Sequence, residues 1–201
     1  MSGDRRQWPA VAPDGDTELL VLARRCLEGD EAAWRTLYRG QAPRITRFLC
    51  SLLGPTSDLD DLDDLVQQVF VETLGRLASF RGEAGLTTWM YGIAANVAAR
   101  HRRFQFRWRR RGHAWSEQLD GQEGGDPADG AQARAAWRTV AGALEAMDFR
   151  LRVAWTMREV EGMAYDEIAR ALDVPIGTVR SRLSTARQRR LAAIEAAEVV
   201  L

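Results

Sequence analysis

Apolar residues recur at steps of three and four along most of the chain, which is the spacing of amphipathic helices. In the first half we expect four helices, at residues 16–28, 30–54, about 58–77, and from 87 or 88 into the segment 100–111. Asp30 is suited to cap the second helix, and Thr87 or Thr88 the fourth, because short polar side chains accept hydrogen bonds from unpaired backbone amides. Pro43 should kink the second helix.

The second half shows the same period after a change in composition. We expect helices at residues 133–147, 149–160, about 165–172 and about 176–197, and no segment alternates as a strand would. Residues 112–132 hold five Gly, one Pro and five acids, the composition of a flexible linker that could stretch to roughly 70 Å and let the halves lie far apart. The prediction is an all-α chain with a disordered arm at 1–16 and helical domains at 17–111 and 133–201.

Composition narrows the function classes. The 201 residues are 46% hydrophobic and 28% charged, which suits a globular protein, and no apolar run reaches the ~18 residues of a membrane span. The N-terminus lacks the apolar core of a secretory signal, so we expect a cytoplasmic protein without membrane insertion. Two Cys and two His without zinc spacing predict neither metal nor cofactor.

Charge sums to zero but is unevenly distributed. All 28 basic residues are Arg, against 28 acidic residues. Residues 58–72 carry six acids and no Arg, whereas 100–111 carry seven Arg and 180–190 carry five, with no acid in either. One segment therefore suits a basic partner surface, and two suit an acidic one such as nucleic acid.

The most specific motif is YDEIARALDVPIGTVRSRLS at residues 165–184, where two expected helices flank a three-residue turn. Ala169 is small enough for the helices to approach closely, and the second helix carries a face of Arg and hydroxyl side chains. Such a face can bond base edges and phosphates, so the motif indicates a DNA-binding helix-turn-helix. The alternative is a plain helical hairpin with a solvated Arg face.

Two other segments are less specific. In LDDLDDLVQQVF the acids and amides share one helix face, which is either a solvated helix start or a protein-binding surface. In FRGEAGLTTWMYGIAANVAARHRRF, Phe80, Trp89 and Tyr91 could stack on unpaired bases while Arg side chains hold the backbone. Alternatively, these aromatic residues belong to the core and the Arg residues keep the protein in solution.

Together, and in this order, the three segments resemble the extracytoplasmic-function class of bacterial sigma factors over about residues 17–193. LDDLDDLVQQVFVETL resembles the helix of the σ2 domain that binds core RNA polymerase. FRGEAGLTTWMYGIAANVAARHRR resembles the promoter-melting segment, and MREVEGMAYDEIARALDVPIGTVRSRLSTARQRRL the σ4 domain. The resemblance implies a σ2-like four-helix domain and a σ4-like helix-turn-helix domain.

The same resemblance implies a function and its partners. The chain would bind core RNA polymerase and direct promoter recognition and transcription initiation, in a stress or envelope response. Promoter DNA would be its second partner and an anti-sigma factor its third. The polymerase would supply the chemistry, so no active site and no small-molecule substrate are expected.

Roles of individual residues follow from the resemblance. Contacts with core polymerase are implied for Asp61, Asp64, Leu65, Gln67, Gln68 and Phe70. Contacts with the melted −10 element are implied for Phe80, Arg81, Gly82, Thr87, Thr88, Trp89, Asn96, Arg100 and Arg103. Contacts with the double-stranded −35 element are implied for Thr178, Arg180, Ser181, Ser184, Thr185 and Arg187. Gln68 and Thr185 depart from the family, in which Glu and Arg are more frequent at these positions.

Two other functions compete with this one. A helix-turn-helix regulator that acts without core polymerase would bind duplex DNA alone as a dimer, but it gives no reason for the acidic helix or the melting segment. A nucleic-acid-processing enzyme would need a nucleophile, a phosphate loop or converging metal carboxylates. The sequence has no P-loop motif and no metal-ligand cluster, so we do not expect an enzyme.

Overall fold

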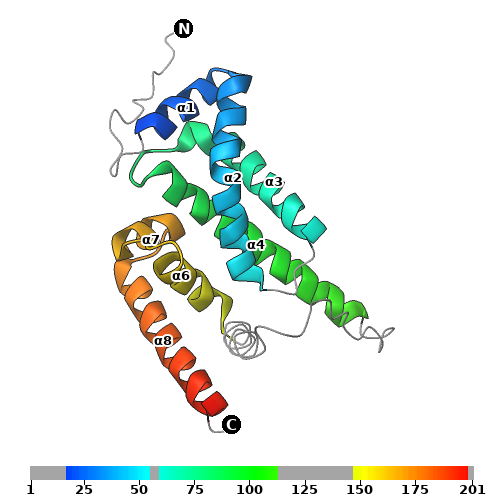
Figure 1. Cartoon of the computed structure of the whole chain (residues 1–201), viewed down its shortest axis with the longest axis vertical. Helices are drawn as coiled ribbons and strands as arrows, with labels where there is room; N and C mark the ends of the chain where they lie inside the picture. Colours follow the sequence, from blue (N-terminus) through cyan, green and yellow to red (C-terminus); the bar gives the residue numbers. More distant parts are fainter. Residues whose placement is uncertain (1–16, 55–58, 113–146, 199–201) are drawn as a thin grey trace, which may run out of the picture.

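The computed structural model describes residues 17–54, 59–112 and 147–198, and these stretches contain helices and no strand. The elements are α1 (Thr17–Leu27), α2 (Glu31–Leu53), α3 (Leu59–Arg76), the short 3-10 helix η1 (Leu77–Ser79), α4 (Leu86–Gly112), α6 (Phe149–Glu159), α7 (Tyr165–Leu172) and α8 (Ile176–Glu198) (Figure 1). The all-α prediction is confirmed. The arm at 1–16, the linker beyond Gly112 and the helix expected at 133–147, apart from Met147, lie outside the described residues.

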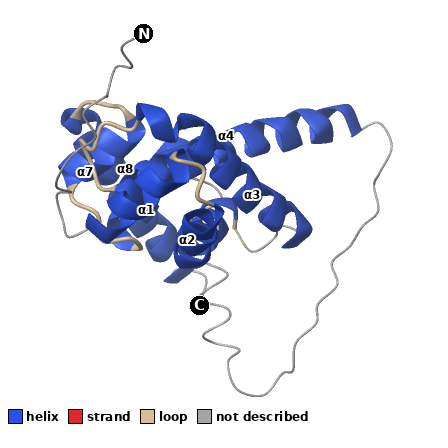
Figure 2. Ribbon diagram, turned by 90° about the horizontal axis from the view of Figure 1, so that it is seen from above, coloured by secondary structure: helices blue, strands red, loops and turns tan. Residues whose placement is uncertain are grey.

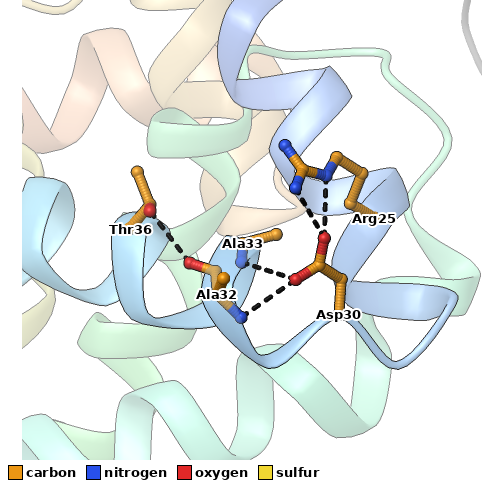
Figure 3. Close-up of polar contacts among 5 residues, drawn as sticks. All are labelled: Arg25, Asp30, Ala32, Ala33 and Thr36. Carbon is orange, nitrogen blue, oxygen red and sulfur yellow. Dashed lines mark hydrogen bonds and ion pairs between the residues drawn. The ribbon is translucent and has the colours of Figure 1, made fainter.

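Asp30 caps α2, as the sequence predicted. Its carboxylate accepts hydrogen bonds from the backbone amides of Ala32 and Ala33, at 2.9 and 3.1 Å (Figure 3). The same carboxylate lies 2.7 Å from Nη2 of Arg25 on α1, so the cap also ties the two helices together. The backbone hydrogen bond from Ala33, followed by the bond from Arg25, lowers the pKa of Asp30 below its ordinary value.

The start of α4 differs from the prediction. The helix begins at Leu86, so Thr87 and Thr88 lie inside its first turn and do not cap it. The Oγ1 of Thr87 instead donates a hydrogen bond to Oε1 of Gln41 on α2, at 3.2 Å, and both side chains are buried. A partner 46 residues away in sequence therefore uses the hydroxyl that local propensity assigned to a cap.

Helices α1 to α4 form a bundle in which α2 packs against the other three (Figure 1). Its core is built from the apolar stripes that the sequence pattern revealed, and it includes fully buried Leu37, Ile45, Phe48, Val69 and Met90. The C-terminal part of α4 projects beyond the bundle as an arm (Figure 2). None of the helices in the described part of the chain is long and apolar enough to cross a membrane.

The two halves of the chain pack against each other, although the linker had suggested that they could lie far apart. Helix α7 lies against α4 and α6 against α2, and their buried residues form one continuous core (Figure 1). Gly92 marks a close approach of the two backbones, because a Cβ there would lie 2.1 Å from the carbonyl oxygen of Ala171. The hydroxyl of Tyr91 donates a hydrogen bond across the same interface to Glu161.

A buried arginine adds a second polar link between the halves. Arg152 of α6 is only 2% exposed, and its Nη1 donates to the carbonyl oxygen of Leu52 in the last turn of α2, at 2.9 Å. At another edge of the interface, the guanidinium of Arg102 on α4 lies 4.8 Å from the ring centre of Phe149 on α6. Specific contacts therefore hold the halves in one arrangement.

Candidate functional site

The α3 residues for which contacts with core polymerase are implied divide into an exposed polar set and a buried apolar set. Asp64, Gln67 and Gln68 are exposed, as a binding surface requires. Leu65 and Phe70 are only 8% and 2% exposed, so they pack beneath that surface and are not free to meet a partner here.

Asp61 lies at the edge of the same face and is held by α4. Its Oδ2 accepts a hydrogen bond from Nε2 of Gln105 at 3.1 Å, and Nε2 of His101 lies 3.7 Å away. The Asp61 side chain nevertheless remains 47% exposed. Helix α4 therefore orients this carboxylate without covering it.

Three exposed apolar side chains on or beside α3 were missed by sequence reasoning. Val71 is 65% exposed and Leu74 45%, while Tyr38 of the neighbouring α2 is 38% exposed. Leu74 fits the apolar period of α3, which is why its exposure was not expected. Their exposure could have been predicted from their positions, because Val71 and Leu74 continue the three- and four-residue steps of the acid and amide face.

We call this face the α3 surface and define it as Asp61, Asp64, Gln67, Gln68, Val71 and Leu74. Exposed apolar side chains beside acidic ones are typical of a protein-binding surface, whereas a merely solvated helix face carries few of them. The α3 surface therefore favours the protein-binding alternative for the acidic segment.

The segment that resembles a promoter-melting segment, residues 80–103, is partly core and partly surface. Phe80 is 6% exposed, and its ring centre lies 5.2 Å from that of half-buried Trp89. Between them the loop turns at Gly82, whose φ of 69° suits glycine, and exposes Arg81. Thr88, like Thr87, is 8% exposed.

One face of α4 continues from this loop. Asn96, Arg100 and Arg103 are exposed and follow Trp89 at helical spacing, so the structure brings these four onto one side of the helix. We call them the α4 face. Tyr91 does not belong to it, because this residue is 3% exposed and lies 4.8 Å from the ring of Phe48. Burial, and then the carboxylate of Glu161, raises the pKa of Tyr91.

Helices α7 and α8 form the expected helix-turn-helix. Asp173 takes the left-handed conformation at the turn, with φ of 51°, and the amide of Val174 bonds to the carbonyl of Ala169 at 3.0 Å. Ile168 and Val179 are fully buried between the helices. The carboxylate of Glu167 accepts from the backbone amide of Ala164 and secures the start of α7.

The outer face of α8 carries the remaining predicted residues, which we call the α8 face. Arg180, Ser181, Ser184 and Arg187 are exposed, and Thr178 and Thr185 are half-buried. Arg187 donates from Nη2 to the hydroxyl of Tyr165 at 3.2 Å and lies 3.6 Å from Glu159. The hydroxyl of Thr185 donates to the backbone carbonyl of Ser181, at 3.0 Å.

Within the described ranges, no group of three His, Cys, Asp or Glu residues is placed to hold a metal ion. The side chains on these surfaces suit recognition by charge, hydrogen bonds and apolar contact. Acid and amide groups gather on α3, whereas Arg, hydroxyl and aromatic groups gather on α4 and α8.

Comparison with known proteins identifies the family. The model of sigma-70 region 2 matches residues 37–109, and that of sigma-70 region 4 matches residues 138–189. The ECF RNA polymerase sigma-E factor of Escherichia coli K12 is 31% identical over 175 residues, which cover 84% of this chain and 90% of that protein. The chain belongs to the extracytoplasmic-function family of sigma factors.

As a member of this family, the protein binds core RNA polymerase and directs promoter recognition and transcription initiation. The sigma-E factors of Salmonella typhimurium LT2 and Haemophilus influenzae are 31% and 30% identical, each over 84% of this chain and 90% of the relative. The region 2 match covers α3 and most of α4, so it argues against a helix-turn-helix regulator that acts without polymerase.

Two solved structures have a similar fold. CnrH, in complex with the cytosolic domain of CnrY, matches with a TM-score of 0.60 and 22% identity, over 88% of this chain and 96% of that one. The sigma factor RpoE of Bartonella quintana, in complex with the anti-sigma factor NepR, matches with a TM-score of 0.55 and 24% identity, over 80% of this chain and 96% of that one. Both matches span α-helices from the two halves.

Proposed function

We propose that this sigma factor assigns its three tasks to three surfaces: the α3 surface binds core polymerase, the α4 face holds the melted −10 strand, and the α8 face reads the −35 element. It acts in the cytoplasm, where polymerase and chromosome meet, and it has no catalytic activity of its own. The observation that carries the proposal is the α3 surface, where exposed acidic, amide and apolar side chains lie side by side.

The chemistry of the α3 surface suits a basic partner with apolar side chains among its charges. Charge complementarity orients the two proteins, and burial of Val71 and Leu74 adds affinity. Asp61 is fixed by Gln105, so this carboxylate loses little freedom on binding. The buried residues Leu65 and Phe70 support the surface from below.

The α4 face offers the two kinds of contact that a single strand needs. Trp89 provides an aromatic platform on which an unpaired base can stack, and Arg100 and Arg103 provide charges for phosphates. Asn96 can hydrogen-bond to a base edge. Phe80, Thr87 and Thr88 are buried, so their part is to shape the loop that receives the base.

The α8 face suits the major groove of duplex DNA. Arg180 can donate two hydrogen bonds to a guanine, and the nearby serines can bond to bases or phosphates. Arg187 is already held by Tyr165 and Glu159, which favours a fixed phosphate contact for this residue. The DNA is thereby read on α8 and opened along α4.

A protein inhibitor is the third proposed partner. CnrH and RpoE, which share this fold, were each solved in complex with another protein, CnrY and NepR respectively. The α3 surface of this chain combines exposed apolar and acidic groups, which an inhibitor can cover as readily as polymerase can. An inhibitor of this kind should therefore compete with core polymerase for the sigma factor.

The test is charge reversal on the α3 surface. We expect Asp61→Arg with Asp64→Arg to abolish co-purification with core polymerase and run-off transcription, because like charges at an interface cost several kcal/mol. The control is Glu18→Arg with Glu28→Arg, which changes charge equally at two exposed positions, one in α1 and one directly after it. Circular dichroism establishes that both variants are folded. Normal polymerase binding by the α3 variant would contradict the proposal.

A further inference from the structure

One carboxylate lies between the surfaces proposed to meet polymerase and DNA. Glu72 belongs to α3, and its side chain is only 14% exposed. Its Oε1 accepts hydrogen bonds from Nε2 of Gln68, at 3.1 Å, and from Nη2 of Arg100 on α4. Its Oε2 lies 3.0 Å from Nη2 of Arg76. Glu72 was counted in the acidic segment of the sequence but was given no role.

The three partners of Glu72 belong to different places. Gln68 is part of the α3 surface, Arg100 is part of the α4 face, and Arg76 belongs to neither. Because both Gln68 and Arg100 bond to the same oxygen, the position of each depends on the carboxylate between them. Because the Glu72 side chain is little exposed, its ion pair with Arg100 is stronger than one in free solvent, where water and salt screen the charges.

We propose that Glu72 is a positioning residue that aims Arg100 at the melted strand and Gln68 at polymerase, and thereby couples the two binding events. The proposal rests on the roles proposed above for Gln68 and Arg100. A long Arg side chain samples many rotamers in solution, and ordering it on binding DNA opposes the contact. Glu72 restricts those rotamers before the DNA arrives.

The coupling follows from the shared oxygen. When polymerase engages the amide of Gln68, Oε1 of Glu72 loses one of its donors and interacts more strongly with Arg100. Coupling of this kind is reciprocal, so a strand that fixes Arg100 against Oε1 weakens the hold of Glu72 on Gln68 and leaves the Gln68 amide free for polymerase. Polymerase binding and strand capture would then favour each other through a single side chain.

The experiment uses the full-length sigma factor with saturating core polymerase and a promoter that carries a fluorescent base analogue in its −10 element. We expect Arg100→Ala to lower the open-complex equilibrium constant about tenfold, the usual scale for losing a charged hydrogen bond. Glu72→Gln should lower it about threefold, as for a partly exposed ion pair. The double variant should equal Arg100→Ala alone, because Glu72 acts through Arg100.

A matched control and a second cycle separate positioning from structure. Arg76→Gln removes an ion pair from the same carboxylate and should leave promoter opening unchanged. In the second cycle, Glu72→Gln and Gln68→Ala are combined, and core affinity is measured by fluorescence anisotropy. The double variant should bind core polymerase no more weakly than Gln68→Ala alone. Thermal melting of every variant reports any loss of fold.

The outcomes are distinct. Full promoter opening by Arg100→Ala would overturn the proposed role of Arg100 itself. A loss in Arg100→Ala with an additive or absent effect of Glu72→Gln would overturn the positioning role of Glu72. Higher promoter opening in Glu72→Gln would also overturn it, because Glu72 would then restrain Arg100 from DNA. An equal loss in Arg76→Gln would assign the effect to helix stability.

Discussion

Four of the six side chains proposed to read duplex DNA lie exposed on α8, Arg180 and Ser184 among them, whereas Phe80, Thr87 and Thr88 of the segment proposed to melt DNA are at most 8% exposed. The difference matches the form of the DNA. A duplex presents its base edges in grooves that already exist, so the protein surface can be complete beforehand. An unpaired base has to leave the stack before a protein can hold it, so we expect the loop proposed to receive it to rearrange on binding.

Helices α8 and α4 also differ in the elements that they pack against. Helix α8 packs against α6 and α7 of its own half, while α4 carries both the α4 face and the contacts to α7. Tyr91 and Gly92 of the interface follow Trp89 of the α4 face directly in sequence. We therefore expect separation of the halves to release the helix proposed to hold the melted strand and to leave the helix-turn-helix intact.

The largest effect should come from adding a methyl group at the interface. In Gly92→Ala the new Cβ would lie 2.1 Å from the backbone oxygen of Ala171, which no side-chain movement can relieve. We expect the halves to move apart, at an overpacking cost of about 1–3 kcal/mol. Small-angle X-ray scattering of the free sigma factor should show a larger radius of gyration.

Gly40→Ala is the matched control, since it makes the same change inside α2 where a Cβ meets nothing within 4 Å. Ala is the better helix former by about 1 kcal/mol, so this variant should be at least as stable as the parent and equally compact. If Gly92→Ala were also as compact and stable as the parent, the closed arrangement of the halves would be wrong.

Local patterns were enough to predict most helices. The apolar stripes of α2 and α3 face the core, and Asp30 caps α2 because its carboxylate reaches the amides of its own first turn. These features depend on neighbours a few residues apart. The three-residue turn between α7 and α8 was also predicted from local sequence, and in the structure Asp173 takes the left-handed conformation there, which Asp tolerates.

Long-range contacts could not be predicted from those patterns. Thr87 looked like a cap, but its hydroxyl bonds to Gln41 on another helix. Gly92 looked unremarkable inside α4, but it allows α7 to approach. The Gly-rich linker suggested separate halves, because composition says how far a linker can reach and not whether its two ends pack together. The residues of the three proposed surfaces were chosen by motif, whereas Glu72, which lies between two of these surfaces, was given no role.

A substitution on the exposed α8 face tests the contrast between this face and the segment proposed to melt DNA. If Arg180 is bidentate to a guanine, Arg180→Ala should weaken use of the −35 element by about 1–3 kcal/mol. Changing that base pair should then matter less to the variant than to the parent in a promoter-binding titration. An equal loss of affinity on every sequence would make Arg180 a phosphate contact, and base readout would fall to its neighbours.

A smaller effect is expected at Tyr91. Tyr91→Phe keeps the ring against Phe48 but removes the hydrogen bond to Glu161, so we expect a loss of about 1 kcal/mol in urea unfolding. Burial raises the pKa of Tyr91, so the unfolded chain releases this proton first. The stability due to Tyr91 should be complete below its ordinary pKa of about 10 and decline at higher pH.

The variant therefore should lose less stability than the parent between neutral and strongly alkaline pH. A measurement of promoter opening distinguishes this role in stability from a direct role of Tyr91 in DNA binding. If Tyr91 stacked on the melted strand, Tyr91→Ala should impair promoter opening at saturating polymerase even when the halves are already apart. If the alkaline decline were the same in parent and Tyr91→Phe, the buried hydrogen bond would not be the source of the stability.

The smallest effects should come from two helix caps, one in each half. Asp30 caps α2, and the carboxylate of Asp148 accepts from the amide of Arg150 at the start of α6, at 2.9 Å. Asp30→Ala and Asp148→Ala should each lower the melting temperature slightly, as lost caps do. Because the halves share one core, we expect each variant to melt in a single transition by circular dichroism, shifted as a whole.

The response to pH distinguishes the cap from a general loss of helix. The pKa of Asp30 is lowered in the folded chain, so its stabilisation is present above the ordinary carboxylate value near 4 and is lost as pH falls through the lower folded value. The gap between the parent and Asp30→Ala should therefore close in strongly acidic buffer. A gap that stays constant would show that the carboxylate charge is not what stabilises α2. Two separate transitions in either cap variant would show that the halves unfold independently, and that their contact adds little to the stability of either half.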